Sequence, residues 1–276
     1  MTVGDALRQA TKTLARISDT ARLDAELLMA HALGVSRSDM LLRHGDAQAP
    51  GTFASLIERR ARREPVAYII GEQEFFGRPF IVTPDVLIPR ADSEAVVEAA
   101  LPFVADTSRV LDCGTGSGAL LLTLLAERPG ANGVGTDASL AVLAVAAANA
   151  GRLGLAPRAR MLRRDWHEAG WADDLGQFAF IIANPPYVEA DAALAPDVRD
   201  FEPGGALFAG PDGLDDYRAL VPQLPGLLTT GGAAVLEIGA TQGDAVEEIA
   251  RASGFAVTRH RDLGGRGRAL MCTVEP

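Results

Sequence analysis

Short apolar segments alternate with helical segments from about residue 109 to the end of the chain. Parallel strands need long crossover connections, and these are usually helices, so the alternation predicts a mainly parallel sheet with helices on both faces. The sequence therefore favours an α/β fold over an all-helical or all-strand one. Seven segments are predicted to be strands, at residues 109–113, 133–136, 160–163, 178–183, 233–237, 256–260 and 269–274.

The first seventy residues follow a different pattern. Apolar residues recur at intervals of three and four, which predicts short helices at about residues 3–17, 23–33, 36–42 and 51–64. Gly34 is placed to end the second helix, and Ser36 to cap the third. Aromatic and β-branched residues on both sides of Gly77 then predict a β-hairpin. We expect a helical domain at 1–71, a β-hairpin linker at 72–90 and the α/β domain at 91–276.

The composition excludes several classes of protein. The chain has 276 residues, of which 48% are hydrophobic and 22% charged, so it can bury a sizeable core and is not a disordered chain. No segment approaches the roughly 18 to 20 apolar residues of a membrane span. Charged residues also interrupt the N-terminal segment, which therefore lacks the apolar core of a signal peptide. We expect a soluble protein that is not exported.

Charge and cysteine content bear on partners and location. The net charge of −10 argues against a nucleic-acid substrate without excluding one. Cys113 and Cys272 fit neither a disulfide framework nor a metal site, and the four histidines are scattered. These features favour a reducing, cytoplasmic location and chemistry without a metal.

A glycine-rich segment joins the first predicted strand to a helix. Gly114-Thr115-Gly116-Ser117-Gly118 follow the strand directly, and such a turn lets a ligand approach the backbone at a helix N-terminus. Asp137 ends the next predicted strand, where its carboxylate can accept hydrogen bonds from both hydroxyls of a ribose. These features together predict a nucleoside-type cofactor. Tight packing of the glycines and a helix N-cap at Asp137 are the structural alternatives.

The third predicted strand is also followed by an acidic residue. Asp165 is placed to bond an adenine amine, and Trp166 to pack against its ring. Simple packing at the sheet edge explains Trp166 equally well.

The tetrapeptide Asn184-Pro185-Pro186-Tyr187 directly follows an apolar strand. An amide or aromatic-amine nitrogen is a poor nucleophile because its lone pair is delocalised. The side-chain oxygen of Asn184 and the carbonyl oxygen of Pro185 can accept the two hydrogens of such a nitrogen, and Tyr187 can pack on the planar group. The prolines keep the geometry rigid, so orientation does most of the catalytic work. The motif predicts methyl transfer from S-adenosylmethionine to such a nitrogen.

Several segments resemble the HemK/PrmC family of protein-(glutamine-N5) methyltransferases, which modify peptide chain release factors. The resemblance extends over essentially the whole chain, and its linker segments are more specific than the glycine turn. It is carried by residues 63–71 (REPVAYIIG), 75–76 (FF), 82–90 (VTPDVLIPR), 110–118 (VLDCGTGSG), 184–187 (NPPY) and 201–203 (FEP).

The resemblance implies a Rossmann-like, seven-stranded methyltransferase domain whose last strand is antiparallel, and an N-terminal helical domain that helps to dock the release factor. It implies that residues 114–118, Asp137, Trp166 and Asn184 contact S-adenosylmethionine, which leaves as S-adenosylhomocysteine. Residues 184–187 would hold the substrate, a glutamine in the Gly-Gly-Gln loop of class I release factors. The chain departs from the family at Ala91, where proline is common, and at Cys113, where leucine is usual.

Some questions stay open from the sequence. Arg59, Arg60, Arg62 and Arg63 either face an acidic partner or ribosomal RNA, or form a solvated helix end. Glu237 ends a strand near the expected cleft and is either functional or structural. The tetrapeptide serves equally well in a glutamine methyltransferase for a ribosomal protein or in a DNA or rRNA amino-methyltransferase. A cofactor-binding scaffold without turnover is a further alternative.

Overall fold

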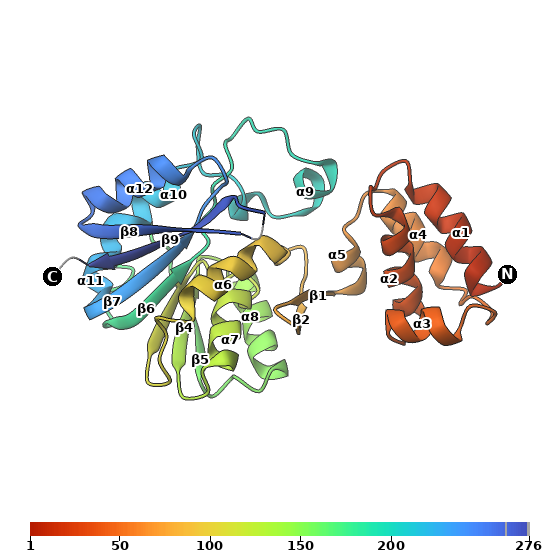
Figure 1. The fold of residues 1–276 in the computed structure, drawn as a ribbon, viewed down its shortest axis with the longest axis horizontal. Coiled ribbons are helices and arrows are strands. Elements are labelled where there is room, and N and C mark those ends of the chain that lie inside the picture. The colour runs from red at the N-terminus through yellow and green to blue at the C-terminus, as the bar shows by residue number, and fades with distance from the viewer. Residues whose placement is uncertain (263, 275–276) are drawn as a thin grey trace. The chain divides into compact units, whose positions relative to one another are not determined.

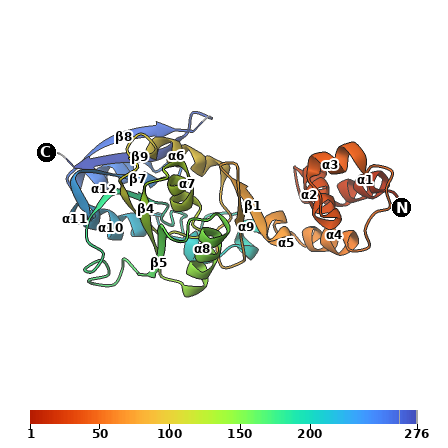
Figure 2. The same cartoon turned by 90° about the horizontal axis from the view of Figure 1, so that it is seen from below.

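The structure is a computed structural model and describes residues 1–262 and 264–274 (Figures 1 and 2). Its contacts divide the chain into two compact units. The smaller unit contains Met1–Glu72 together with Leu194–Glu202, and the larger contains Gln73–Ala193 and the chain from Pro203 onward. The sequence assigned residues 194–202 to the larger domain, whereas their contacts group them with the helical unit.

A seven-stranded sheet forms the centre of the larger unit, in the order β5-β4-β3-β6-β7-β9-β8. Neighbouring strands from β5 to β7 pair in parallel, and β9 is antiparallel to both β7 and β8. This confirms the predicted α/β fold with an antiparallel last strand. The strands are β3 (Arg109–Cys113), β4 (Asn132–Asp137), β5 (Ala159–Arg163), β6 (Phe178–Ala183), β7 (Leu228–Glu237), β8 (Phe255–Arg261) and β9 (Gly267–Val274).

Helices cover both faces of this sheet. On one face lie α6 (Glu94–Ala100), α7 (Ala119–Glu127) and α8 (Leu140–Arg152); on the other lie α10 (Asp215–Leu220), α11 (Leu224–Leu227) and α12 (Gly243–Ala252) (Figure 1). Seen from below, α7 lies beside β4 and α8 beside β5 (Figure 2). Side chains alternate between faces along a strand, so Phe180 packs into the first layer and Ile181 into the second. Each layer therefore has its own apolar core.

The smaller unit is helical, as expected. Gly34 ends α2 with φ +67°, and the Ser36 hydroxyl accepts a hydrogen bond of 3.0 Å from the Asp39 amide at the start of α3, which confirms both predicted caps. The short helix α5 was not predicted, because its residues begin the segment whose pattern resembles strands. The helices are α1 (Val3–Leu14), α2 (Ala21–Leu33), α3 (Arg37–Arg43), α4 (Phe53–Ala61), α5 (Val66–Ile70) and α9 (Pro196–Phe201).

The predicted hairpin is also present. β1 (Glu72–Phe75) and β2 (Arg78–Ile81) pair in a two-stranded sheet. The turn residues Phe76 and Gly77 both have positive φ, +51° and +72°, as a tight hairpin turn requires. Short 3₁₀ helices form η1 (Ala91–Ser93), η2 (Gly204–Ala206) and η3 (Val221–Gln223). Within the described residues, no helix has both the length and the apolar character that crossing a membrane requires.

The order of the strands predicts where a ligand binds. The chain builds outward from β3 to β4 and β5, and then returns to β6 on the other side of β3. In open α/β sheets, a crevice forms at the carboxyl ends of the strands where this direction reverses. The glycine turn after β3 and the tetrapeptide after β6 both lie at that edge.

Candidate active site

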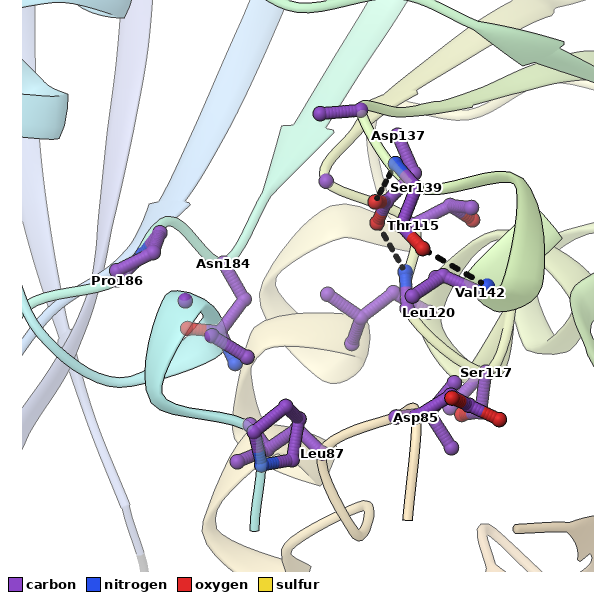
Figure 3. A pocket seen from close by; sticks show the side chains of 18 of the residues that line it. Asp85, Leu87, Thr115, Ser117, Leu120, Asp137, Ser139, Val142, Asn184 and Pro186 are labelled. Atoms are coloured by element: carbon purple, nitrogen blue, oxygen red, sulfur yellow. Dashed lines mark hydrogen bonds between the residues drawn. The ribbon is translucent and has the colours of Figure 1, made fainter. Parts of the chain in front are cut away.

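A cavity of about 610 Å³ lies at this edge of the sheet. Its volume is in the range of sites for small molecules and cofactors, about 300 to 1,000 Å³. Figure 3 shows Thr115 and Asp137 on one side of the cavity and Asn184 and Pro186 on another. The lining includes residues 84–87, 89, 90, 93, 114–117, 137–139, 142, 164–167, 184, 186, 203, 205, 206 and 216.

Most of the residues that the sequence predicted to bind cofactor or substrate therefore line this one cavity. Gly118, Pro185 and Tyr187 belong to the same motifs but do not line the cavity. Gly118 is the N-cap residue of α7 with φ +83°, and Pro185 is buried. The wall formed by residues 84–90 was missed as part of the site, although its sequence supplied one of the family motifs.

The glycine turn has the backbone conformation that its sequence requires. Gly114 and Gly116 have φ of +74° and +55°, in the region that side chains disfavour. A Cβ atom on Gly114 would lie 3.1 Å from Cη2 of Trp166. The indole of Trp166 therefore packs directly against the turn, and a larger residue at position 114 would displace it.

Asp137 is anchored to the backbone around it. Its carboxylate accepts hydrogen bonds from the amides of Gly116, at 3.4 Å, and Ser139, at 3.0 Å. Burial is the main cause of its raised pKa. The N-cap of α8 is Ser139, whose hydroxyl accepts from the Val142 amide at 3.4 Å, so the alternative role of Asp137 as the N-cap itself is wrong. Asp137 lines the cavity with a fixed orientation.

Asp112 was missed by the sequence reasoning. It lies inside β3 with no exposed surface, and its Oδ2 accepts a hydrogen bond of 2.7 Å from the Thr115 hydroxyl. Its Oδ1 has no hydrogen-bond partner among the described residues. Burial raises the pKa of this carboxyl to about 7. An acidic residue within an apolar strand, two positions before the first glycine of the turn, was the signal that could have identified it.

Trp166 and its neighbours form the wall beyond β5. The indole nitrogen of Trp166 donates to Oδ1 of Asp216 at 3.0 Å, and the same oxygen lies 3.0 Å from Nε2 of His167. Asp165 accepts from the amide of His167 at 2.9 Å. All four residues line the cavity. His167 and Asp216 were not predicted as site residues, because neither belongs to a motif and Asp216 is distant in sequence.

The tetrapeptide is held in place at Tyr187, by a hydrogen bond to its backbone and by packing of its ring. Asn184 follows β6 and lines the cavity, whereas the backbone carbonyl of Tyr187 accepts a hydrogen bond of 2.9 Å from the Gln242 side chain. The ring of Tyr187 packs against the second core layer. Burial, followed by the nearby charge of Glu237, raises the pKa of its phenol to about 12.

Glu237 lies behind the tetrapeptide rather than in the cavity wall. It ends β7, is almost fully buried, and has a pKa of about 7, raised mainly by burial and lowered by Ser93 and Arg268. Arg268 also pairs with Asp92, which connects η1 to β9. These contacts favour a structural role for Glu237.

The arginine run is not uniformly solvated. Arg60 is buried, and its Nε donates to Oδ2 of Asp24 at 2.8 Å; its Nη2 lies 3.7 Å from the carboxylate of Asp197. The expectation that all four arginines face solvent or a partner is therefore wrong for Arg60. Arg59 forms an ion pair with Glu64 and is partly exposed. Apolar periodicity does not distinguish these positions, because Arg60 lies on the same buried side of α4 as its apolar residues.

Among the described residues, the cysteines and the potential metal ligands form neither a reactive thiol site nor a metal site. Cys113 and Cys272 are both buried, unpaired thiols. Burial raises the pKa of the Cys113 thiol, so it stays protonated and unreactive at neutral pH. Over residues 1–262 and 264–274, no group of three or more His, Cys, Asp or Glu side chains is placed to hold a metal ion.

Two family models match this chain. Residues 5–71 match the PrmC N-terminal domain, and residues 94–200 match the methyltransferase small domain. The first match agrees with the helical unit, and the second contains the glycine turn, Asp137, Trp166 and the tetrapeptide.

Two curated relatives match this chain over almost their full length. A release factor glutamine methyltransferase from Cereibacter sphaeroides is 46% identical over 279 residues, covering 98% of both chains. One from Moorella thermoacetica is 44% identical over 281 residues, again covering 98% of both. Among solved structures, a methyltransferase from Pyrococcus furiosus is similar with a TM-score of 0.53 and 18% identity, covering 72% of this chain and 90% of that one. This last likeness concerns the fold alone.

Proposed function

The chain belongs to the release factor glutamine methyltransferase family, and on that premise we propose that it methylates a release factor. The methyl group passes from S-adenosylmethionine to the side-chain amide nitrogen of a glutamine. One observation carries the proposal: Asn184 of the tetrapeptide and the glycine turn with Asp137 line the same cavity. We further propose that the glutamine is that of the Gly-Gly-Gln loop in class I release factors.

The lining residues fit the cofactor. The positive φ angles of Gly114 and Gly116 leave the backbone of the turn open to close approach. Asp137 can accept hydrogen bonds from the ribose hydroxyls, since a carboxylate oxygen has more than one lone pair. Trp166 offers an apolar ring to the adenine. When bound, S-adenosylmethionine supplies an electrophilic methyl carbon.

The tetrapeptide is proposed to bind and orient the glutamine. The side-chain oxygen of Asn184 and the carbonyl oxygen of Pro185 accept the two amide hydrogens in the plane of the amide, so the nitrogen lone pair, which is perpendicular to that plane, is left free to face the methyl carbon. The N–C bond would form as the carbon–sulfur bond of the sulfonium breaks, which leaves S-adenosylhomocysteine, and the nitrogen would then lose one proton to water. With a pKa of about 12, the phenol of Tyr187 stays protonated at neutral pH, so this residue is not a base; its ring packs against the second core layer and holds the tetrapeptide in place.

Three further assignments belong to the same proposal. The helical unit takes part in docking the release factor, in agreement with its match to the PrmC N-terminal domain. The enzyme works in the cytoplasm, where two unpaired thiols remain reduced. Nucleic acid is not its direct substrate, since the net charge is −10.

The proposal is tested by incubating the enzyme with labelled S-adenosylmethionine and a purified class I release factor. We expect label on the wild-type release factor and none on a variant whose Gly-Gly-Gln glutamine is replaced by asparagine. Ribosomal proteins, DNA and rRNA serve as competing acceptors. Faster labelling of any of these than of the release factor would contradict the proposed substrate.

A further inference from the structure

We propose that Asp216 is a positioning residue of the cofactor site, which holds the indole of Trp166 in place against the glycine turn. This inference rests on the proposed function, because it takes S-adenosylmethionine as the ligand of the cavity. Asp216 lies in the first turn of α10, 50 residues beyond Trp166, and belongs to none of the sequence motifs.

The contacts of Trp166 fix both ends of its ring system. At one end, the indole nitrogen donates to Oδ1 of Asp216 at 3.0 Å. At the other end, Cη2 and Cζ3 approach Gly114 so closely that a Cβ atom there would lie 3.1 and 3.3 Å from them. A planar group held at both ends has little freedom to turn about its own bonds.

Asp216 is suited to this task by its surroundings. It is only 8% exposed and lines the cavity. An indole N–H that is removed from water usually requires an acceptor, and a carboxylate oxygen is a stronger acceptor than a neutral one. His167 shares the same oxygen, but its side chain is 54% exposed and can exchange this contact for water. Trp166 is therefore the partner that depends more on Asp216.

The hydrogen bond between Asp216 and Trp166 is expected to increase the affinity for the cofactor. If Asp216 fixes the ring before the cofactor arrives, the adenine meets a wall that is already ordered, and less side-chain freedom is lost on binding. Removing the acceptor leaves the indole N–H unpaired and the ring free to rotate into the cavity. Affinity should then fall although no atom of the tetrapeptide has changed.

Asp216 can also have a purely structural role, stabilising helix α10. An acidic residue in the first turn of a helix also stabilises the helix through its dipole. Asp215 occupies the same turn, pairs with Arg218 at 3.2 Å, and does not line the cavity. Asp215 therefore provides a matched control for loss of a carboxylate from this helix.

The test measures binding of S-adenosylhomocysteine by calorimetry to the full-length chain. We expect Asp216→Leu to weaken binding about tenfold, which corresponds to about 1.4 kcal/mol. Asp216→Asn keeps an oxygen acceptor and should stay within about threefold of wild type, while Asp215→Leu should leave the affinity unchanged. In a Trp166→Phe background, Asp216→Leu should have almost no further effect, because its partner is gone.

A spectroscopic measurement adds a readout that helix stability alone does not move. The chain has two tryptophans, so in a Trp171→Phe background the emission reports only Trp166. Asp216→Leu should shift this emission in the free enzyme, and Asp216→Asn should restore most of it. Equal losses of affinity for Asp216→Leu with and without Trp166, or an unchanged emission, would overturn the inference.

Failure of this inference and failure of the proposed function give different results. Binding of S-adenosylhomocysteine needs no release factor, so it is measured independently of the substrate. Unaltered binding by Asp216→Leu, in an enzyme that methylates its release factor, defeats the inference alone. A wild-type chain that does not bind S-adenosylhomocysteine defeats both.

Discussion

The hydroxyl of Thr115 donates a 2.7 Å hydrogen bond to Oδ2 of Asp112, and so connects the glycine turn to a carboxyl group with no exposed surface. This bond favours the charged form of Asp112, but burial opposes it more strongly, and the pKa rises to about 7. A residue at the base of the cofactor turn therefore titrates near neutral pH, which makes the stability of the turn dependent on pH.

Asp112→Asn should change how stability depends on pH. Because the folded-state pKa lies above the ordinary value of 3.8, the folded protein binds this proton more tightly than the unfolded chain. The contribution of Asp112 to stability is therefore greatest below about pH 4 and is lost as the pH rises through about 7. Asparagine keeps an acceptor for Thr115 but does not titrate.

Thermal melts of the cofactor-free proteins check this prediction. Relative to wild type, the Asp112→Asn melting temperature should increase between about pH 5 and about pH 8. Asp174→Asn, which changes an exposed carboxylate, is the control and should show a nearly constant difference. A constant difference for Asp112→Asn as well would mean that the buried carboxyl does not titrate in this range.

Gly114→Ala should disturb the site more than a positive φ alone explains. The new Cβ would lie 3.1 Å from the indole of Trp166, and the backbone at Gly114 has φ +74°. Gly154 has φ +70° with no atom near a Cβ, so Gly154→Ala carries only the backbone cost, about 1 kcal/mol. We expect Gly114→Ala to cost about 2 to 3 kcal/mol of unfolding free energy, measured by denaturant titration. Equal losses for the two variants would contradict the close approach.

Arg60→Ala should destabilise the helical unit, whereas Arg59→Ala should not. Removing Arg60 leaves the buried carboxylate of Asp24 with its ion-pair partner missing, and breaking a buried pair costs about 3 to 5 kcal/mol. Arg59 and Glu64 are partly exposed, so that pair is worth at most about 1 kcal/mol. Calorimetric unfolding of the full chain measures both variants. Similar melting curves would show that Arg60 is not the buried anchor of this unit.

Asp137→Ala should mainly weaken cofactor binding. The substitution removes the proposed ribose acceptor and the contacts that Gly116 and Ser139 make with it. We expect the affinity for S-adenosylhomocysteine to fall about tenfold to a hundredfold, as loss of charge-assisted hydrogen bonds predicts. Asp165→Ala, at the neighbouring strand end, serves as the comparison and should have a smaller effect. Unchanged binding by Asp137→Ala would overturn the ribose assignment.

The sequence predicted those parts of the site that depend on neighbouring residues. The turn at Gly114 and the tetrapeptide each follow a strand directly, and Asp137 is the last residue of β4. Local pattern and the geometry of parallel sheets were therefore sufficient to bring them to one edge. The hairpin turn and the caps at Gly34 and Ser36 were predictable for the same reason.

Contacts between distant residues were not predictable in this way. Asp216 joins Trp166 across 50 residues, and no periodicity shows which of two adjacent aspartates, Asp215 or Asp216, faces the cavity. Arg60 appeared to be a surface charge because its partner, Asp24, lies on another helix. The short helix α5 contains β-branched residues, which favour strands when tertiary contacts are unknown.

Asn184 is proposed to orient a glutamine amide for methyl transfer. This role is tested most sharply by tandem mass spectrometry of release-factor peptides after incubation with S-adenosylmethionine and either wild-type enzyme or Asn184→Ala, with cofactor affinity measured in parallel. Wild type should add the mass of one methyl group to the Gly-Gly-Gln glutamine. Asn184→Ala should bind the cofactor within about tenfold of wild type but methylate at least about a hundredfold more slowly. An unmodified glutamine with a folded, cofactor-bound wild-type enzyme, or equal rates for the two proteins, would show that Asn184 does not have this role.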